Sequence, residues 1–219
     1  MSTTSLTTTS PTTAALIIYV AWLAIALVSR GVLQYVRTGD HGFRLHGDRP
    51  FTGAWFARIG FVVALVIGGL SPVLVLTHTL APIGAIDTAT LRLVGFVLAV
   101  AGVAATFIAQ LAMGASWRVG VDSHERTELI VRWPFTLVRN PIFSAMGATV
   151  VGLALMVPTW LALAGVVLLG WSLEYQVRRV EEPYLRSVHA EHYEQYVAQV
   201  GRFIPGVGRS ALQPDRAAR

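Results

Sequence analysis

The chain has 219 residues, of which 54% are hydrophobic and only 13% are charged. Soluble domains usually carry about 25% charged residues, so this composition predicts an integral membrane protein. The absence of cysteine excludes disulfides, cysteine nucleophiles and thiolate metal sites. All 17 basic side chains are arginines, and the net charge is +5. Because the arginines lie between apolar runs and form no single cluster, they indicate membrane topology and argue against a nucleic-acid partner.

The N-terminal half contains three apolar runs. We expect residues 1–13, rich in Ser and Thr, to form a disordered tail and not a signal peptide. The first run, 14–36, is long enough for a transmembrane helix, and so are the runs at 59–80 and 93–113. The second contains Gly68-Gly69 and Ser71-Pro72, which permit close helix contact and a kink. In the third we expect Gln110 to make an interhelical hydrogen bond or to lie at the interface.

Two further apolar runs, 142–157 and 160–173, form a hairpin around Pro158-Thr159. Both are short for a bilayer at about 1.5 Å per residue, but the second reaches adequate length if it continues through Val177. The fold class predicted is therefore all-α, a polytopic transmembrane bundle of about five spans with an amphipathic C-terminal helix. A re-entrant hairpin is the alternative for the last two runs.

The arginines alternate between the loops. The N-terminal tail and the loops at 77–92 and 158–159 hold one arginine between them, whereas the other loops and the C-terminal tail hold nearly all the rest. This alternation predicts an outside N-terminus and a cytoplasmic C-terminus in a plasma membrane of the bacterial type. We predict transmembrane helices over 14–113, a catalytic region with the hairpin over 114–209, and a flexible tail over 210–219. His41 and His46 fit a solvated loop better than a metal site, so no metal is expected.

The hairpin brings two charged segments to one side of the membrane. Leu137–Phe143, "LVRNPIF", precedes it, and "RRVEEPYL" follows it from Arg178. Helical spacing places Glu174, Arg178, Glu181 and Glu182 on one face. Pro183 requires the helix to kink or to restart with Pro183 in its first turn. The acids could form a surface ion-pair cluster with a capping role, but their place at a membrane boundary opposite an arginine favours a functional site.

The last element expected is an interfacial helix. Tyr193 and Tyr196 lie on a polar helix and suit the headgroup layer. The segment "GRFIPGVGR" then returns toward the membrane, with an apolar pair between basic residues.

The motifs "TELIVRWPFTLVRNPIF", "RRVEEPYL", "HYEQY" and "GRFIP", in this order around a hydrophobic hairpin, resemble the isoprenylcysteine carboxyl methyltransferase family. The phospholipid methyltransferases share this C-terminal pattern, and the resemblance covers roughly the last hundred residues. It implies an integral membrane methyltransferase that uses S-adenosylmethionine without a Rossmann domain. No GxGxxG follows a strand pattern in the chain.

The resemblance also implies site residues. The expected catalytic residues are Arg139, Asn140, Glu181 and Glu182. The expected cofactor-binding residues are Glu128, Leu129, Pro134, Phe135, Arg139, Asn140, Pro141, Glu181, Glu182, Tyr193 and Tyr196. Of the two acids, we expect Glu182 to contribute slightly more. The family usually has histidine and tyrosine where this chain has Asn140 and Phe143. Asparagine can donate a hydrogen bond but cannot act as a base near neutral pH, so these departures bear on the acceptor more than on the cofactor.

The chemistry of the cofactor suits these residue types. A sulfonium donor needs carboxylates near its positive groups, an arginine or backbone donors for its own carboxylate, and aromatic surface for its adenine. The partners expected are membrane lipids and a lipid or lipophilic small-molecule acceptor that enters from the bilayer.

Two alternatives remain open from the sequence. A sterol-reductase-like protein would bind NADPH, whose phosphates could be held by Arg178, Arg179, Arg186 and Arg202. A membrane scaffold or small-molecule carrier would bind neither cofactor, and its paired acids would be structural.

Overall fold

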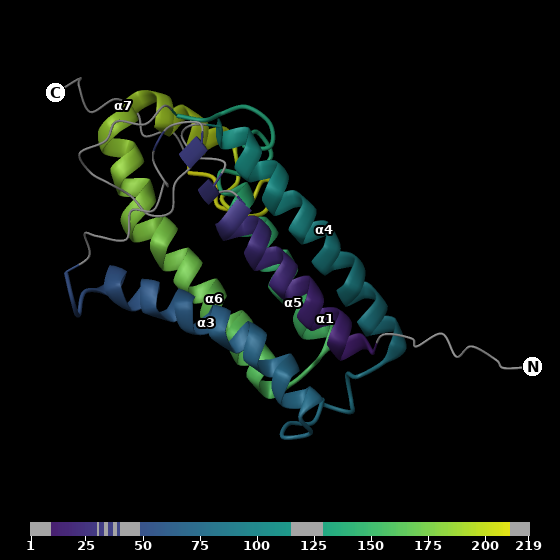
Figure 1. The fold of residues 1–219 in the computed structure, drawn as a ribbon. Helices are drawn as coiled ribbons and strands as arrows, with labels where there is room; N and C mark the ends of the chain where they lie inside the picture. Colours follow the sequence, from purple (N-terminus) through teal and green to yellow (C-terminus); the bar gives the residue numbers. More distant parts are fainter. Residues whose placement is uncertain are drawn as a thin grey trace, which may run out of the picture.

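The computed structural model describes residues 10–29, 31–32, 35–36, 39, 49–114 and 129–210 (Figure 1). Within these ranges the regular structure is helical, and extended backbone pairs only in one isolated bridge. Four described helices are long and apolar enough to cross a membrane, and a fifth apolar helix is shorter. The predicted all-α polytopic bundle is therefore confirmed.

Helix α1 (Pro11–Leu23) continues as the π-helical segment η1 (Ala24–Ser29). The helix begins earlier than predicted because Ser10 caps it and proline, which needs no hydrogen-bond acceptor, occupies its first position. Within the third apolar run, Gln110 donates a hydrogen bond of 2.9 Å from Nε2 to the carbonyl oxygen of Ala26. The expected interhelical hydrogen bond is thus confirmed, and it fixes the π-helical segment.

Helix α3 (Gly53–Leu76) also begins earlier than predicted, since Thr52 caps it and the interfacial residues that follow are helical. Its glycine pair packs on the ring of Tyr19 from α1. A Cβ atom added at Gly69 would lie 2.7 Å from a ring carbon, and one at Gly68 would lie 3.1 Å from another. The close helix contact predicted for this pair is therefore present, and only glycine permits it.

Helices α4 (Ala89–Met113) and α5 (Pro141–Met156) pack along one another at backbone contact. A Cβ atom added at Gly95 would lie only 2.5 Å from the carbonyl oxygen of Gly152. Small residues at such positions let membrane helices approach closely, where dispersion and weak polar contacts stabilise the pair. This interface anchors α5, at whose beginning the predicted site lies.

The turn after α5 reaches the far end of the bundle. There the Ile83 N–H, in the loop between α3 and α4, donates to the carbonyl oxygen of Pro158 at 2.7 Å. Although α5 has only 16 residues, it thus extends from the site to the α3–α4 loop. This geometry fits a hairpin that crosses the bundle better than one that turns back midway.

A helical run of 40 residues, bent at Ala190, follows the turn. It comprises α6 (Trp160–Gln176), the π-helical segment η3 (Val177–Glu181) and α7 (Glu182–Gln199). At about 1.5 Å per residue it is roughly 60 Å long, about twice the hydrocarbon thickness of a bilayer. Its apolar part is α6, so η3 and α7 lie beyond the membrane-spanning segment. Pro183 lies in the first turn of α7, as one of the two predictions placed it, but Glu181 and Glu182 keep a helical backbone, so the run passes through η3 without a break there.

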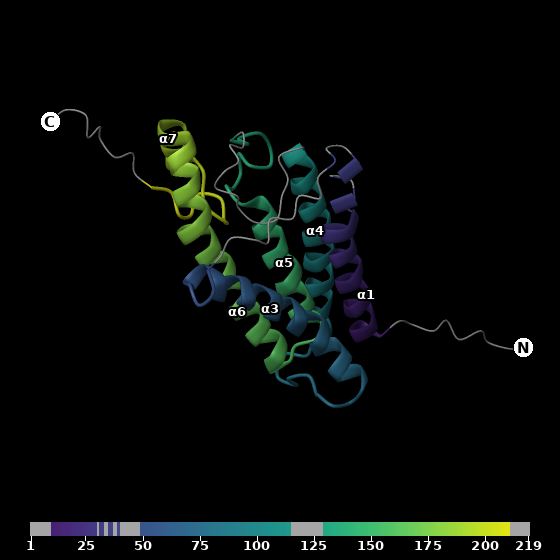
Figure 2. The same ribbon diagram turned by 60° about the vertical axis from the view of Figure 1, so that its left-hand side comes forward.

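The bundle consists of two groups of helices. In both views α1, α4 and α5 run side by side, while α3 crosses against α6 (Figures 1 and 2). The beginning of α1 and the α3–α4 loop lie at the lower end of these views, and α7 lies at the upper end. The polar segments before α5 and after α6 therefore meet at one end of the bundle, as the sequence predicts.

Candidate functional site

The segment before α5 and the chain after α7 meet as short extended strands. Val138 and Gly201 form a parallel bridge, in which the Arg139 N–H donates to the carbonyl oxygen of Gly201 at 2.8 Å. The Asn140 backbone N–H and side-chain Nδ2 both donate to the carbonyl oxygen of Arg202, at 3.1 and 3.2 Å. These bonds hold the C-terminal chain against the beginning of α5 and position Arg139 between the two.

Arg139 forms a buried ion pair with Glu182. Its Nη2 lies 2.9 Å from Glu182 Oε1, and the two side chains are 2% and 4% exposed. Nη2 also donates to the carbonyl oxygen of Gly208 at 3.1 Å, and Nη1 donates to the carbonyl oxygens of Val197 and Val200. Both terminal nitrogens are thus occupied by protein acceptors. Only the buried Nε has no hydrogen-bond partner.

Glu182 is surrounded by arginines. Arg202 donates from Nε to Oε1 at 2.6 Å and from Nη2 to Oε2 at 3.1 Å, while Arg186 Nη1 lies 3.8 Å from Oε2. Burial opposes ionisation of Glu182, but the hydrogen bonds and charges of Arg202 and Arg139 outweigh it and lower the pKa of Glu182. We call these four residues (Arg139, Glu182, Arg186 and Arg202) the arginine–glutamate cluster. Its central pair, Arg139 and Glu182, is buried, whereas the sequence alternative was a surface ion-pair cluster.

Glu181 has a different environment from its neighbour. It is partly buried at the end of η3, it makes no capping hydrogen bond to α7, and no salt bridge joins it to another described residue. The pKa of the Glu181 carboxyl is raised to about 7, chiefly by burial. A side-chain hydrogen bond with Gln176 lowers this pKa, and the negative charge of Glu182 raises it. Of the two acids, Glu181 is therefore the one with charge available to a ligand. The expectation that Glu182 contributes slightly more to cofactor binding stays a prediction.

Aromatic residues from α7 and the 129–140 segment lie beside the cluster. Tyr193 is 2% exposed, and burial raises its pKa to about 12. The Tyr196 hydroxyl donates to the carbonyl oxygen of Phe135 at 2.6 Å, and the two tyrosine rings are 6.3 Å apart. Phe135 itself is buried. This contact joins the C-terminal part of α7 to the segment that carries Arg139.

Most predicted site residues are thus brought together. Pro134 is buried next to Phe135, and Pro141 is the first residue of α5. Leu129 is partly buried at the start of the segment. Glu128 lies outside the described residues. The interactions described here unite these predicted residues around the cluster: Phe135, Arg139, Asn140, Glu182, Tyr193 and Tyr196.

Several residues that the structure places here have no site role predicted from the sequence. Arg202 lies in the "GRFIP" motif and had been considered only as a phosphate ligand in the reductase alternative. Arg186 had been considered in the same way, although its i+4 spacing from Glu182 signals a pair. Ser144 donates from Oγ to the carbonyl oxygen of Phe203 at 2.7 Å, a contact that no local pattern predicts.

The arginines that the reductase alternative needs are largely committed to carboxylates. Arg202 binds Glu182, Arg186 donates to Glu194 at 2.8 Å, and Arg178 pairs with Glu174. A phosphate ligand would have to compete with these pairs. This arrangement does not favour a dinucleotide phosphate site.

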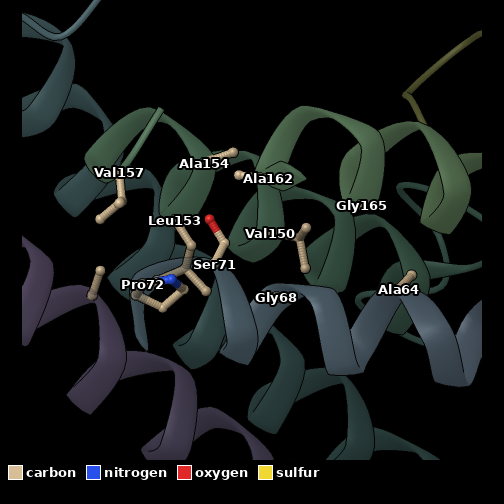
Figure 3. Close-up of a pocket in the computed structure, with 11 residues that line it drawn as sticks. Ala64, Gly68, Ser71, Pro72, Val150, Leu153, Ala154, Val157, Ala162 and Gly165 are labelled. Carbon is tan, nitrogen blue, oxygen red and sulfur yellow. The ribbon is translucent and has the colours of Figure 1, made fainter. Parts of the chain in front are cut away.

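A small cavity lies elsewhere, between α1, α3, α5 and α6 (Figure 3). Its wall is mostly apolar, and its buried Ser71 shares a hydrogen bond of 2.7 Å with Thr159. None of the predicted site residues lines it. Among the described residues, no group of three or more acids and histidines could hold a metal ion. The lining residues are Ala15, Ala64, Gly68, Ser71, Pro72, Val150, Leu153, Ala154, Val157, Ala162 and Gly165.

Comparison with known proteins agrees with the resemblance seen in the sequence. The family model for phospholipid methyltransferases matches residues 90–192, from the first turn of α4 into α7. The match includes Arg139, Glu181 and Glu182 and ends before Tyr193 and Arg202. No curated protein and no solved structure matches the chain. Residues 90–192 of this integral membrane protein, just under half of the chain, are therefore similar to the phospholipid methyltransferase family.

Proposed function

We propose that the protein is an S-adenosylmethionine-dependent methyltransferase whose acceptor is a lipid or small apolar molecule that reaches the site from the bilayer. The family match supports methyl transfer. The observation that carries the choice of cofactor is the contrast between the two acids. Glu182 is neutralised by arginines, whereas Glu181 has no salt bridge to another described residue.

The groups at the site fit a sulfonium cofactor. A fixed positive charge beside Glu181 would lower the pKa of its carboxyl and keep it ionised, which is the reverse of the effect of burial. The Nε of Arg139 is buried and has no hydrogen-bond partner, so a cofactor carboxylate would accept from it only after the surrounding chain opens. Phe135 and Tyr193 place aromatic rings beside the cluster; both are buried, so a purine would stack on them only after the surrounding chain opens. The residue types that such a cofactor needs are thus gathered here, in a closed arrangement that would open to admit it.

When bound, S-adenosylmethionine would supply the methyl group, whose bond to sulfur breaks as its bond to the acceptor atom forms, leaving S-adenosylhomocysteine. The contribution of the protein to such an in-line displacement is orientation and exclusion of water. Glu181 would hold the positive end of the cofactor. Arg139 and Glu182 would position the C-terminal chain around it, and the buried Tyr193 would keep water away.

The acceptor is proposed from the location of the site. Glu181 lies five positions beyond the last residue of the apolar helix α6, at the boundary between membrane and water. An acceptor with an apolar body in the bilayer and its reactive atom at this boundary fits that position. One N–H of the Asn140 side-chain amide donates to the carbonyl oxygen of Arg202, which leaves the second N–H of Nδ2 for a hydrogen bond to an acceptor molecule.

The proposal can be tested by calorimetry with S-adenosylhomocysteine on detergent-purified protein. We expect Glu181→Gln to weaken binding at least about 30-fold, because loss of one partner of a desolvated charge pair typically costs 2–5 kcal/mol. The matched control is Glu191→Gln, an exposed acid on α7, which should leave affinity unchanged. Stabilisation by NADPH and not by S-adenosylhomocysteine would favour the reductase. Binding of neither would favour a scaffold.

A further inference from the structure

Residues 201–208, which lie beyond the family match, form a closed loop that we call the C-terminal lip. Within it the Arg202 N–H donates to the carbonyl oxygen of Val207 at 2.7 Å, and the Val207 N–H donates to that of Ile204 at 3.0 Å. A Cβ atom added at Gly201 would lie 2.2 Å from the Ile204 oxygen, so only glycine fits. Gly206 has a φ of 80°, a conformation that favours glycine. The lip is therefore a compact and well-defined structure.

The lip is fastened to the membrane end of α5. The Ser144 hydroxyl, one turn into this apolar helix, donates to the carbonyl oxygen of Phe203 at 2.7 Å. On the opposite side, Arg139 donates from Nη2 to the carbonyl oxygen of Gly208 at 3.1 Å. The lip therefore lies level with the first turn of a helix that belongs in the bilayer. Its tip cannot be far from the membrane–water interface.

Large apolar side chains at this level point away from the protein. Ile204 and Val207 at the tip of the lip are 60% and 59% exposed. On the neighbouring segment, joined to the lip by the Val138–Gly201 bridge, Trp133 and Leu137 are also exposed. Tryptophan prefers the headgroup layer of a bilayer, and exposed aliphatic residues on short loops favour its apolar boundary.

A cation accompanies these apolar side chains. A Cβ atom added at Gly206 would lie 3.7 Å from Nη2 of Arg209, so this exposed guanidinium lies beside the tip. An arginine adjacent to an apolar tip can reach phosphate groups while the tip stays in hydrocarbon. The combination is chemically complementary to a phospholipid interface and not to an apolar protein surface alone.

We propose that the C-terminal lip, with Trp133 and Leu137, inserts into the phospholipid interface beside the site, with Arg209 toward the phosphate groups. The partner is the lipid layer itself. The lip is held by Arg139 and contributes Arg202 to the arginine–glutamate cluster. It would therefore mark the side from which a lipid acceptor reaches Glu181, a consequence that rests on the proposed function, whereas insertion itself does not.

Insertion can be measured by site-directed fluorescence, because the chain has no cysteine to interfere with labelling. Single-cysteine variants Ile204→Cys and Val207→Cys carry an environment-sensitive fluorophore, and Glu191→Cys, exposed on α7, is the matched control. The full-length protein is reconstituted in phosphatidylcholine vesicles that contain a phospholipid spin-labelled near the headgroup. We expect quenching at 204 and 207 to exceed that at 191 several-fold.

Equal quenching at the three positions would overturn the proposal and leave the lip as a surface for water or for another protein. Leu137→Cys gives an independent probe of the neighbouring segment if a variant of the lip does not fold.

The role of Arg209 is tested separately. Adding phosphatidylglycerol to the vesicles should increase quenching at position 204, and Arg209→Gln should abolish that increase. An increase that persists without Arg209 would refute its role toward phosphate. None of these measurements depends on methyl transfer, so their failure is distinguishable from failure of the proposed function.

Discussion

Arg139 and Glu182, 43 positions apart in the sequence, form a 2.9 Å ion pair from which water is almost completely excluded. The pair joins the beginning of α5 to the beginning of α7, and the remaining donors of Arg139 hold the chain after α7. Glu182 therefore holds these segments together. We expect substitution of Glu182 to reduce stability and substitution of Glu181 to reduce ligand binding.

Removing the carboxylate of Glu182 should destabilise the fold. Glu182→Gln leaves Arg139 as a buried cation without a counter-charge, and loss of one partner of a buried ion pair typically costs about 3–5 kcal/mol. We expect a correspondingly lower midpoint of thermal or chemical unfolding in detergent. Glu191→Gln, which changes an exposed acid, serves as the control. A midpoint for Glu182→Gln equal to that of the control would show that the cluster contributes no stability.

Glu181 should make stability depend on pH in the opposite direction from an ordinary paired acid. Because its pKa in the folded state is raised to about 7, the folded protein binds more protons than the unfolded chain between the ordinary glutamate pKa and about 7. The stability of wild type should therefore fall relative to Glu181→Gln as the pH rises through this window, and the difference should level off above it. Unfolding midpoints of both proteins from pH 5 to 8 measure this difference. A constant difference over that range would contradict the prediction.

Arg139→Lys should loosen the C-terminal lip. The two terminal nitrogens of Arg139 reach the carboxylate and the carbonyl oxygens of Val197, Val200 and Gly208, and the single ammonium of lysine cannot reproduce this fork. We expect faster hydrogen exchange at the amides of residues 200–208, with little change in α4. Protection equal to wild type in the lip would mean that the bridge to Val138 suffices to hold it.

The bundle could be predicted from the sequence because hydropathy decides it locally. The apolar runs and the close contact at the glycine pair follow from residue types along one segment, whereas the partners Tyr19 and Ala26 come from another helix and were not predicted. The beginnings of α1 and α3 were missed because capping by Ser10 and Thr52 extends each helix past the first apolar residue. Helix ends depend on such short-range hydrogen bonds more than on hydropathy.

The site was predicted only in part, because its key interactions join distant segments. The paired acids and Arg139 stand out at the ends of apolar runs. The sequence could not show that Arg202, 20 positions after Glu182, would neutralise that acid and leave Glu181 as the available one. The different environments of the two acids depend on the C-terminal chain, which returns to the beginning of α5 and is held there by the Val138–Gly201 bridge.

The predicted membrane topology can be tested at the two ends of the helical bundle. The α3–α4 loop and the site lie at opposite ends of the bundle, and the arginine alternation assigns the site to the cytoplasm. Reporter fusions after Asp87 and at Arg219 should therefore report the outside and the cytoplasm, respectively. The same compartment for both would contradict five spans.

Arg186 should act as a positioning residue across a bend in α7. Ala190 interrupts this helix with a φ of 41° and a ψ of −118°. Arg186, before the bend, donates to Glu194 after it at 2.8 Å, and its guanidinium lies 6.0 Å from the centre of the Tyr193 ring. By holding both sides of the bend, it keeps Tyr193 over the arginine–glutamate cluster.

We therefore expect Arg186→Gln to weaken S-adenosylhomocysteine binding several-fold while the midpoint of unfolding changes little, because Glu182 retains its two closer arginines. Arg178→Gln is the matched control, since its exposed pair with Glu174 lies on the same helical run and such pairs contribute little. A merely structural role would lower stability and affinity together. Hydrogen exchange resolves the mechanism, because release of the bend should expose the amides of residues 191–199 and spare those of α6. Unchanged exchange and unchanged affinity would show that the backbone at Ala190, and not Arg186, determines the angle of the helix.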